Sequence, residues 1–88
     1  MSDLHRHYYA AHSYMGLNYT YDSPCWVVYA FDTRQERDQW VRDHEYNQDT
    51  GNYVAKAVSA RVASQIAPDL RTKSLHARTD NPLRVRHL

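Results

Sequence analysis

The segment that most constrains the fold runs from Cys25 to Phe31, with the sequence CWVVYAF. It is apolar at every position and contains neither glycine nor proline. A short buried helix would have the same hydropathy, but β-branched and aromatic residues favour a strand. We therefore expect residues 25–31 to form the central strand of a sheet.

A helix start signal follows this strand directly. Thr33 and Glu36 have the spacing of a capping box, in which the Thr hydroxyl accepts from the backbone amide three residues later. The charged stretch after them predicts a helix that ends in the region Asp43–Tyr46. Trp40 and Val41 are the apolar pair on this helix that we expect to face the sheet.

Two further segments, His5–Tyr14 and Tyr53–Val58, have the alternation of strands. We expect the strand that returns beside the first of them to start at Tyr19–Tyr21. Ser59 is a helix cap for a second helix over Ala60–Ala67, which Pro68 stops. The alternating residues from Leu83 onward predict a short edge strand.

These elements predict an α+β fold in the order ββαβα with a C-terminal tail. The sheet is mainly antiparallel, with three strands or four, and both helices pack on one of its faces. We expect a single domain at residues 1–68 and a basic, extended tail at 69–88. The domain has six basic and eight acidic side chains, a net charge of −2, whereas the tail has a net charge of +3.

Two helices on one face would leave the other face of the sheet open to a partner. The chain has eight Tyr, two Trp and nine Arg, the residue types enriched at interface hot spots. We expect the partner-binding residues to lie on the open sheet face and on the tail. On the sheet face they are Tyr8, Tyr14 and Trp26, and on the tail they are Arg71, Arg78, Arg84 and Arg86. The sequence alone does not separate core tyrosines from surface ones, and a solvated terminus is the alternative for the tail.

The sequence contains few residues in patterns typical of catalytic or metal sites. Cys25 is the only cysteine and is expected to be buried as a small apolar side chain. His5 and His7 could share a strand face, but a zinc site needs further ligands that no spacing supplies. We therefore predict no enzyme activity, no cofactor and no metal. No apolar run reaches the roughly 18 residues of a membrane helix, and we expect a cytoplasmic protein.

Two segments, Val27–Val41 and Val58–Ala63, resemble small proteins of bacteriophages and mobile elements, some of which are anti-CRISPRs. The resemblance covers roughly residues 26–66, where a strand leads through an Asp-Thr cap into a helix. It implies an inhibitor that binds a bacterial defence complex, such as a CRISPR effector, and blocks it sterically. It implies no catalytic residue.

Two other functions stay open at this point. A small nucleic-acid-binding or regulatory protein would use exposed aromatic rings for base stacking and the basic tail for phosphates. A homodimeric assembly protein would bury the open sheet face against a second copy.

Overall fold

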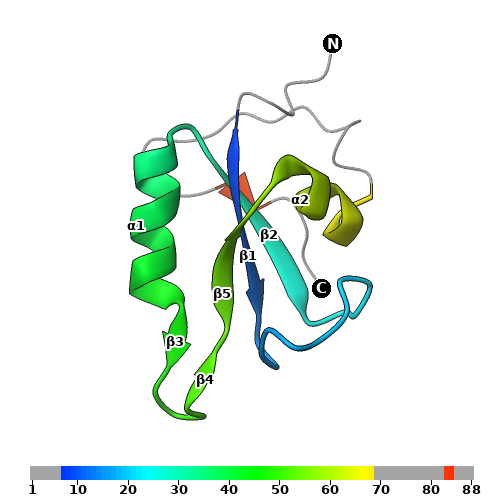
Figure 1. Cartoon of the computed structure of the whole chain (residues 1–88), viewed down its shortest axis with the longest axis vertical. Coiled ribbons are helices and arrows are strands. Elements are labelled where there is room, and N and C mark those ends of the chain that lie inside the picture. Colours follow the sequence, from blue (N-terminus) through cyan, green and yellow to red (C-terminus); the bar gives the residue numbers. More distant parts are fainter. Residues whose placement is uncertain (1–6, 69–82, 85–88) are drawn as a thin grey trace.

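The computed structural model describes residues 7–68 and 83–84 of the 88-residue chain. Figure 1 shows its elements, which in chain order are β1 (Tyr8–Ser13), β2 (Trp26–Phe31), α1 (Arg34–His44), β3 (Tyr46–Asn47), β4 (Asn52–Tyr53), β5 (Ala55–Val58), α2 (Ala60–Ile66) and β6 (Leu83–Arg84). The main sheet is antiparallel in the order β5-β1-β2-β6, and β3 and β4 form a separate hairpin. The α+β fold predicted from the sequence is confirmed.

The apolar strand β2 lies inside the sheet, as its sequence predicts. It pairs with β1 on one side, with Ala30 opposite Tyr9, and with β6 on the other. Five of its six residues are buried, and Tyr29 is half-buried. β2 is thus enclosed along nearly its whole length, which fits a strand without charged side chains.

The larger apolar cluster lies between the sheet and α2. On this face β1 contributes Tyr9 and β2 contributes Trp26 and Val28, all nearly or fully buried. From α2, Ala63 and Ile66 pack into the same cluster and are fully buried. The short α2 therefore covers this face with only a few small and branched side chains.

α1 packs against the other face of the sheet through one large side chain. The Trp40 ring lies 4.8 Å from the Tyr29 ring and 5.7 Å from the Phe31 ring, measured between centroids. Tyr29 and Phe31 alternate along β2 with Val28 and Trp26, so they point to the opposite side. No residue of α1 is fully buried; its two apolar side chains, Trp40 and Val41, are both half-buried, and the Trp40 ring makes the aromatic contacts to the sheet.

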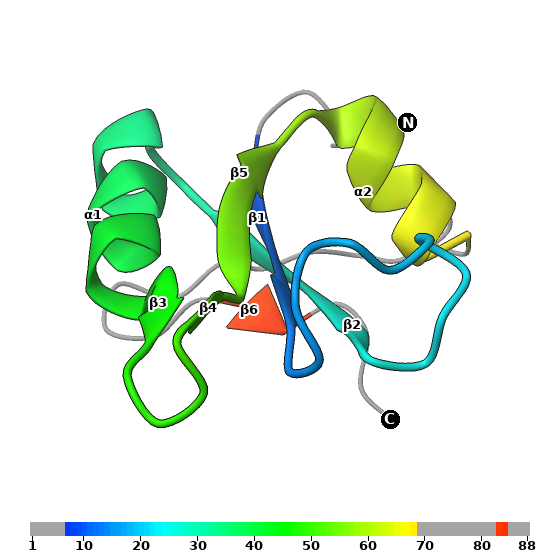
Figure 2. The same cartoon turned by 60° about the horizontal axis from the view of Figure 1, so that its bottom comes forward.

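The structure differs from our prediction in the placement of the helices, because they lie on opposite faces and not on one. Figure 2 shows the sheet between α1 and α2. The physical reason is already present in β2, because a strand that is apolar on both faces needs cover on both faces. The open aromatic sheet face expected from the sequence is therefore not part of this fold.

Both predicted helix caps are confirmed. The Thr33 hydroxyl accepts from the Glu36 backbone amide at 3.1 Å and donates to the Glu36 carboxylate at 2.9 Å. The Ser59 hydroxyl accepts from the Val62 amide at 3.2 Å. Each cap satisfies an amide that has no partner inside the helix, which fixes where the helix begins.

Val54 divides the strand that we expected over Tyr53–Val58. Its amide donates to the carbonyl of Glu45, the C-cap residue of α1, and its carbonyl accepts from the Ser13 amide of β1, both at 2.7 Å. The chain thus passes from β4 into β5 at this residue. The return strand does not start at Tyr19–Tyr21 as we expected; these residues are irregular, and the strand that pairs with β1 begins at Trp26.

The predicted C-terminal edge strand is confirmed as β6, in which Leu83 pairs with Ala30 and Arg84 with Tyr29. Residues 83–84 thus belong to the sheet of the domain, although we had assigned them to the tail. The other tail residues that we singled out lie outside the described part of the chain. Within the described part, no helix has the length and apolar character needed to cross a membrane.

Candidate partner-binding site

Exposed apolar side chains gather at one end of the molecule. Among the described residues, the large hydrophobic side chains that are exposed are Tyr14, Met15, Tyr19, Tyr46 and Tyr53, and we call this set the aromatic end. They come from the segment that joins β1 to β2 and from the β3–β4 hairpin. Both connections lie toward the lower end of the molecule in Figure 1.

The β1–β2 segment is held in place by several hydrogen bonds. Gly16 has a φ of +106°, a conformation that favours glycine, and its amide donates to the Ser13 carbonyl. Farther along, the Trp26 indole donates to the Tyr19 carbonyl at 3.3 Å, and the Lys56 ammonium donates to the Tyr21 hydroxyl at 2.7 Å. The exposed side chains of this segment are therefore carried by an anchored backbone.

The β3–β4 hairpin is built around a polar turn. The side-chain oxygen of Asn47 accepts from the amides of Asp49 and Thr50, and Gly51 has a φ of +72°. Tyr46 and Tyr53 face each other across the hairpin, with ring centroids 5.1 Å apart in an edge-to-face arrangement. The two rings support each other while each keeps about half of its surface exposed.

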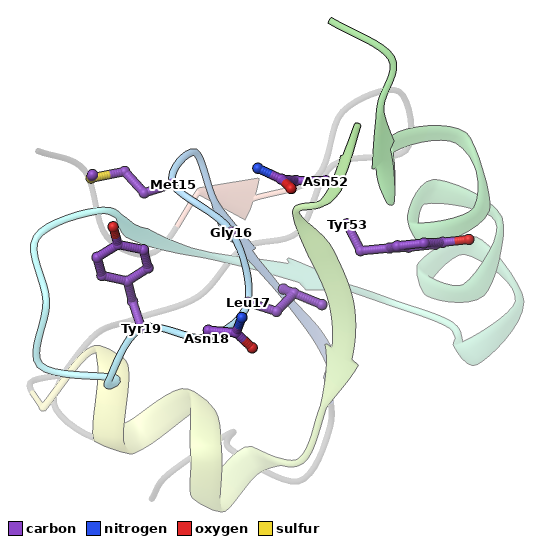
Figure 3. Close-up of a pocket in the computed structure, with 7 residues that line it drawn as sticks. All are labelled: Met15, Gly16, Leu17, Asn18, Tyr19, Asn52 and Tyr53. Atoms are coloured by element: carbon purple, nitrogen blue, oxygen red, sulfur yellow. The ribbon is translucent and has the colours of Figure 1, made fainter. Parts of the chain in front are cut away.

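A hollow of about 290 Å³ separates the two connections. It is lined by both of them, as Figure 3 shows, and the lining residues are Met15, Gly16, Leu17, Asn18, Tyr19, Asn52 and Tyr53. Met15 and Tyr19 come from the β1–β2 segment, and Asn52 comes from β4. In Figure 3 the ring of Tyr53 extends away from the other labelled side chains, so chiefly the rest of this residue borders the hollow.

The two connections carry no positive side chain. Residues 14–25 and 45–55 contain neither Lys nor Arg, whereas they contain the carboxylates Asp22, Glu45 and Asp49. Lys56, which follows the second connection, is directed at the Tyr21 hydroxyl and ring. The aromatic end is therefore neutral to acidic.

The predicted aromatic site residues do not share a surface. Tyr14 is 58% exposed and belongs to the aromatic end. Tyr8 is half-buried, with the guanidinium groups of Arg34 and Arg37 at 5.6 and 5.8 Å from its ring centroid. Trp26 is fully buried in the cluster under α2, so its assignment to an exposed surface was wrong.

The predicted basic site residues are described only in part. Arg84 is on β6, opposite Tyr29 of β2. Arg71, Arg78 and Arg86 lie outside the described residues, and their contribution to binding stays a prediction.

Four members of the aromatic end were not identified from the sequence: Met15, Tyr19, Tyr46 and Tyr53. A usable signal was present, because each is a bulky apolar residue beside turn-forming residues such as Gly16 and Gly51. Turns lie on the surface, so large apolar side chains within them become exposed. We had placed Tyr19 at the start of a strand, where the structure has a bend, and Tyr53 at the start of a longer strand, whereas it ends the two-residue strand β4 beside Gly51.

The described residues offer no group of side chains arranged for metal binding. In that part of the chain, no three His, Cys, Asp or Glu side chains lie close enough together to hold a metal ion. Cys25 is buried, and its sulfur accepts a hydrogen bond from the Ser13 hydroxyl at 3.2 Å. The aromatic end is thus the feature of the described surface that most resembles a binding site.

No protein-family model, curated protein or solved structure matches the chain. The resemblance to small phage proteins therefore stays a prediction from the sequence.

Proposed function

We propose that this protein is a non-catalytic binding protein that acts by covering part of a partner protein with its aromatic end. The observation that supports this function is the concentration of Tyr14, Met15, Tyr19, Tyr46 and Tyr53 on two adjacent connections. Tyrosine contributes a large contact area and a hydroxyl at a small entropic cost, which makes it a frequent hot-spot residue. The backbone beneath these residues is ordered by hydrogen bonds. The loss of backbone conformational entropy on binding is therefore small.

The partner we propose is a defence complex of a bacterial host, with a CRISPR effector as the first to test. This choice rests on the resemblance of residues 26–66 to small phage and mobile-element proteins. In this proposal the chain works in the host cytoplasm and inhibits by steric occlusion, so it needs neither a cofactor nor a catalytic group.

The charge of the aromatic end argues against nucleic acid as the ligand of this surface. Exposed tyrosines stack on bases, but a stacking site also needs cations that follow the phosphates. The two connections provide three carboxylates and no cation. Any nucleic-acid binding would have to use basic residues outside these two connections, such as those of the tail.

The experiment is a reconstitution with purified CRISPR effector complexes that carry their guide RNA. We expect the protein to co-elute with its target in size-exclusion chromatography and to reduce target cleavage in proportion to occupancy. Tyr14→Ala and Tyr53→Ala are each expected to weaken binding about tenfold or more. Arg61→Ala, at an exposed position of α2, is the matched surface control and should bind as the wild type does.

Three results would contradict the proposal. Unchanged affinity of both tyrosine variants would remove the aromatic end from the interface. A shift of free oligonucleotides by the protein alone, lost steeply as salt rises, would identify a nucleic-acid binder instead. A dimeric mass in light scattering that these tyrosine variants convert to a monomer would make the aromatic end a self-association surface.

The tail is tested by a separate variant that carries Arg71→Gln, Arg78→Gln and Arg86→Gln. It retains Arg84, because that residue is part of β6. Weaker binding of the effector by this variant would support the predicted role of the tail, and unchanged binding would confine the interface to the aromatic end.

A further inference from the structure

The hollow within the aromatic end is small. Its volume of about 290 Å³ lies at the lower limit of the roughly 300–1,000 Å³ of small-molecule and cofactor sites. It lies on the surface between two connections that are both mostly exposed. Space of this kind suits one side chain of a partner rather than a complete organic cofactor.

The lining of the hollow combines apolar and hydrogen-bonding groups. Tyr19 contributes an aromatic ring, Met15 a thioether, and Asn18 and Asn52 side-chain amides. An aromatic face attracts a cation that lies over it, and amide oxygens accept hydrogen bonds from ammonium or guanidinium groups. An apolar flank next to such groups also fits the methylene stem of a long basic side chain.

The two connections that border the hollow have a negative net charge. The connections that form it carry Asp22, Glu45 and Asp49 and lack any Lys or Arg. The protein already uses the same chemistry close by, where the Lys56 ammonium lies 5.0 Å from the centroid of the Tyr21 ring. No charged residue lines the hollow itself, so the net charge of −3 on these two connections favours the approach of a basic side chain over that of a carboxylate or phosphate.

We infer that the hollow receives one arginine or lysine side chain of the partner protein, and that the partner surface facing the aromatic end is basic. The inference rests on the proposed function and specifies its partner. Proteins that bind nucleic acids present such surfaces, because cations there neutralise phosphates. Covering one of them would block access of the nucleic acid without any chemical step.

The test uses a tetra-arginine peptide with blocked ends as the probe, and tetra-citrulline as its uncharged control of nearly equal shape. Both are titrated into the ¹⁵N-labelled full-length protein while amide chemical shifts are recorded. We expect saturable shifts that centre on residues 15–19 and 52–53 with tetra-arginine only. Absence of saturation, equal shifts with tetra-citrulline, or shifts that centre elsewhere would overturn the inference.

Two substitutions at one position test the aromatic contact. Tyr19→Leu keeps an apolar side chain but removes the ring, and is expected to weaken tetra-arginine binding about threefold. Tyr19→Phe keeps the ring and should bind as the wild type does, since Tyr19 is 42% exposed and its carbonyl contact to Trp26 is unaffected. Equal binding by the Leu and Phe variants would also overturn the inference.

The two proposals fail in different ways. In one case, Tyr14→Ala loses effector binding but the wild type does not bind tetra-arginine. This result would support the proposed function and reject the inference that the partner surface is basic. Saturable binding of tetra-arginine at the hollow, without binding to any effector complex, would support the recognition of basic side chains and reject the CRISPR effector as partner.

Discussion

The Lys56 ammonium of β5 donates a hydrogen bond to the hydroxyl of Tyr21 over 2.7 Å, which links residues 35 positions apart in the chain. The same ammonium lies over the Tyr21 and Trp26 rings, at 5.0 and 5.7 Å from their centroids. This contact ties the β1–β2 segment to the strand that continues from the β3–β4 hairpin. The two halves of the aromatic end are thereby connected through the fold.

We predict that Tyr21→Phe lowers the free energy of unfolding by about 1 kcal/mol, because it removes the acceptor of a charge-assisted hydrogen bond. The ring and its contact with Lys56 are retained. Urea denaturation monitored by tryptophan fluorescence measures the change. Tyr14→Phe, which removes the hydroxyl of a 58% exposed side chain, is the control and should leave the unfolding midpoint in place. Equal stability of both variants would show that the Lys56 bond contributes nothing.

The burial of Trp26 predicts a structural role for it. Trp26→Ala should lower the free energy of unfolding by about 3–5 kcal/mol, because it opens a cavity in the main apolar cluster. A loss of that size is a large part of the stability of a small domain. Tyr14→Ala removes an exposed ring and should change the melting temperature little. Thermal unfolding followed by circular dichroism compares the two, and similar melting temperatures would contradict the placement of Trp26 in the core.

The attachment of α1 is predicted to depend on Trp40. Replacing Trp40 by Ala removes the ring contacts to Tyr29 and Phe31 and should lower the free energy of unfolding by about 1.5–3 kcal/mol. Amide hydrogen exchange of α1 should become faster than that of β1 and β2. Gln35→Ala, at an exposed position of the same helix, is the control and should keep the exchange pattern of the wild type. Uniform acceleration across the sheet would indicate that α1 does not detach separately.

The cap of α2 offers a fourth test, because this helix has only seven residues. Ser59→Ala removes the side-chain acceptor for the Val62 amide and should lower the free energy of unfolding by about 1 kcal/mol. Ser59→Asp keeps an acceptor at the same position and should recover most of this loss. Chemical denaturation of the wild type and the two variants measures these free energies. An Asp variant as unstable as the Ala variant would argue against a capping role for Ser59.

Much of the local structure could be predicted from the sequence. β-branched and aromatic residues define β2, and the side chains of Thr33 and Ser59 define the starts of both helices. These signals are local, because a cap or a strand pattern depends on residues within a few positions of one another. For the same reason the fold class and the C-terminal edge strand followed from the sequence.

The placement of the elements relative to one another did not follow from local signals. α1 and α2 lie on opposite faces because the alternating sides of β2 bury Trp26 against one helix and Tyr29 against the other. Our expectation of an uncovered face gave too little weight to the fact that β2 is apolar on both sides. Of the three aromatic residues that we assigned to that face, Tyr14 alone belongs to the exposed aromatic end.

The sequence alone was enough to predict β1, β2 and both helices with their first residues, but it missed the β3–β4 hairpin and placed strand structure at residues 19–21 that the fold does not have. The tertiary structure decided which tyrosines are exposed and that the β1–β2 segment and the β3–β4 hairpin share one end of the molecule. The reason is physical: exposure depends on what packs over a residue, and the covering group comes from a distant part of the chain. Residues 19 and 52 line one hollow only after the strands between them have paired.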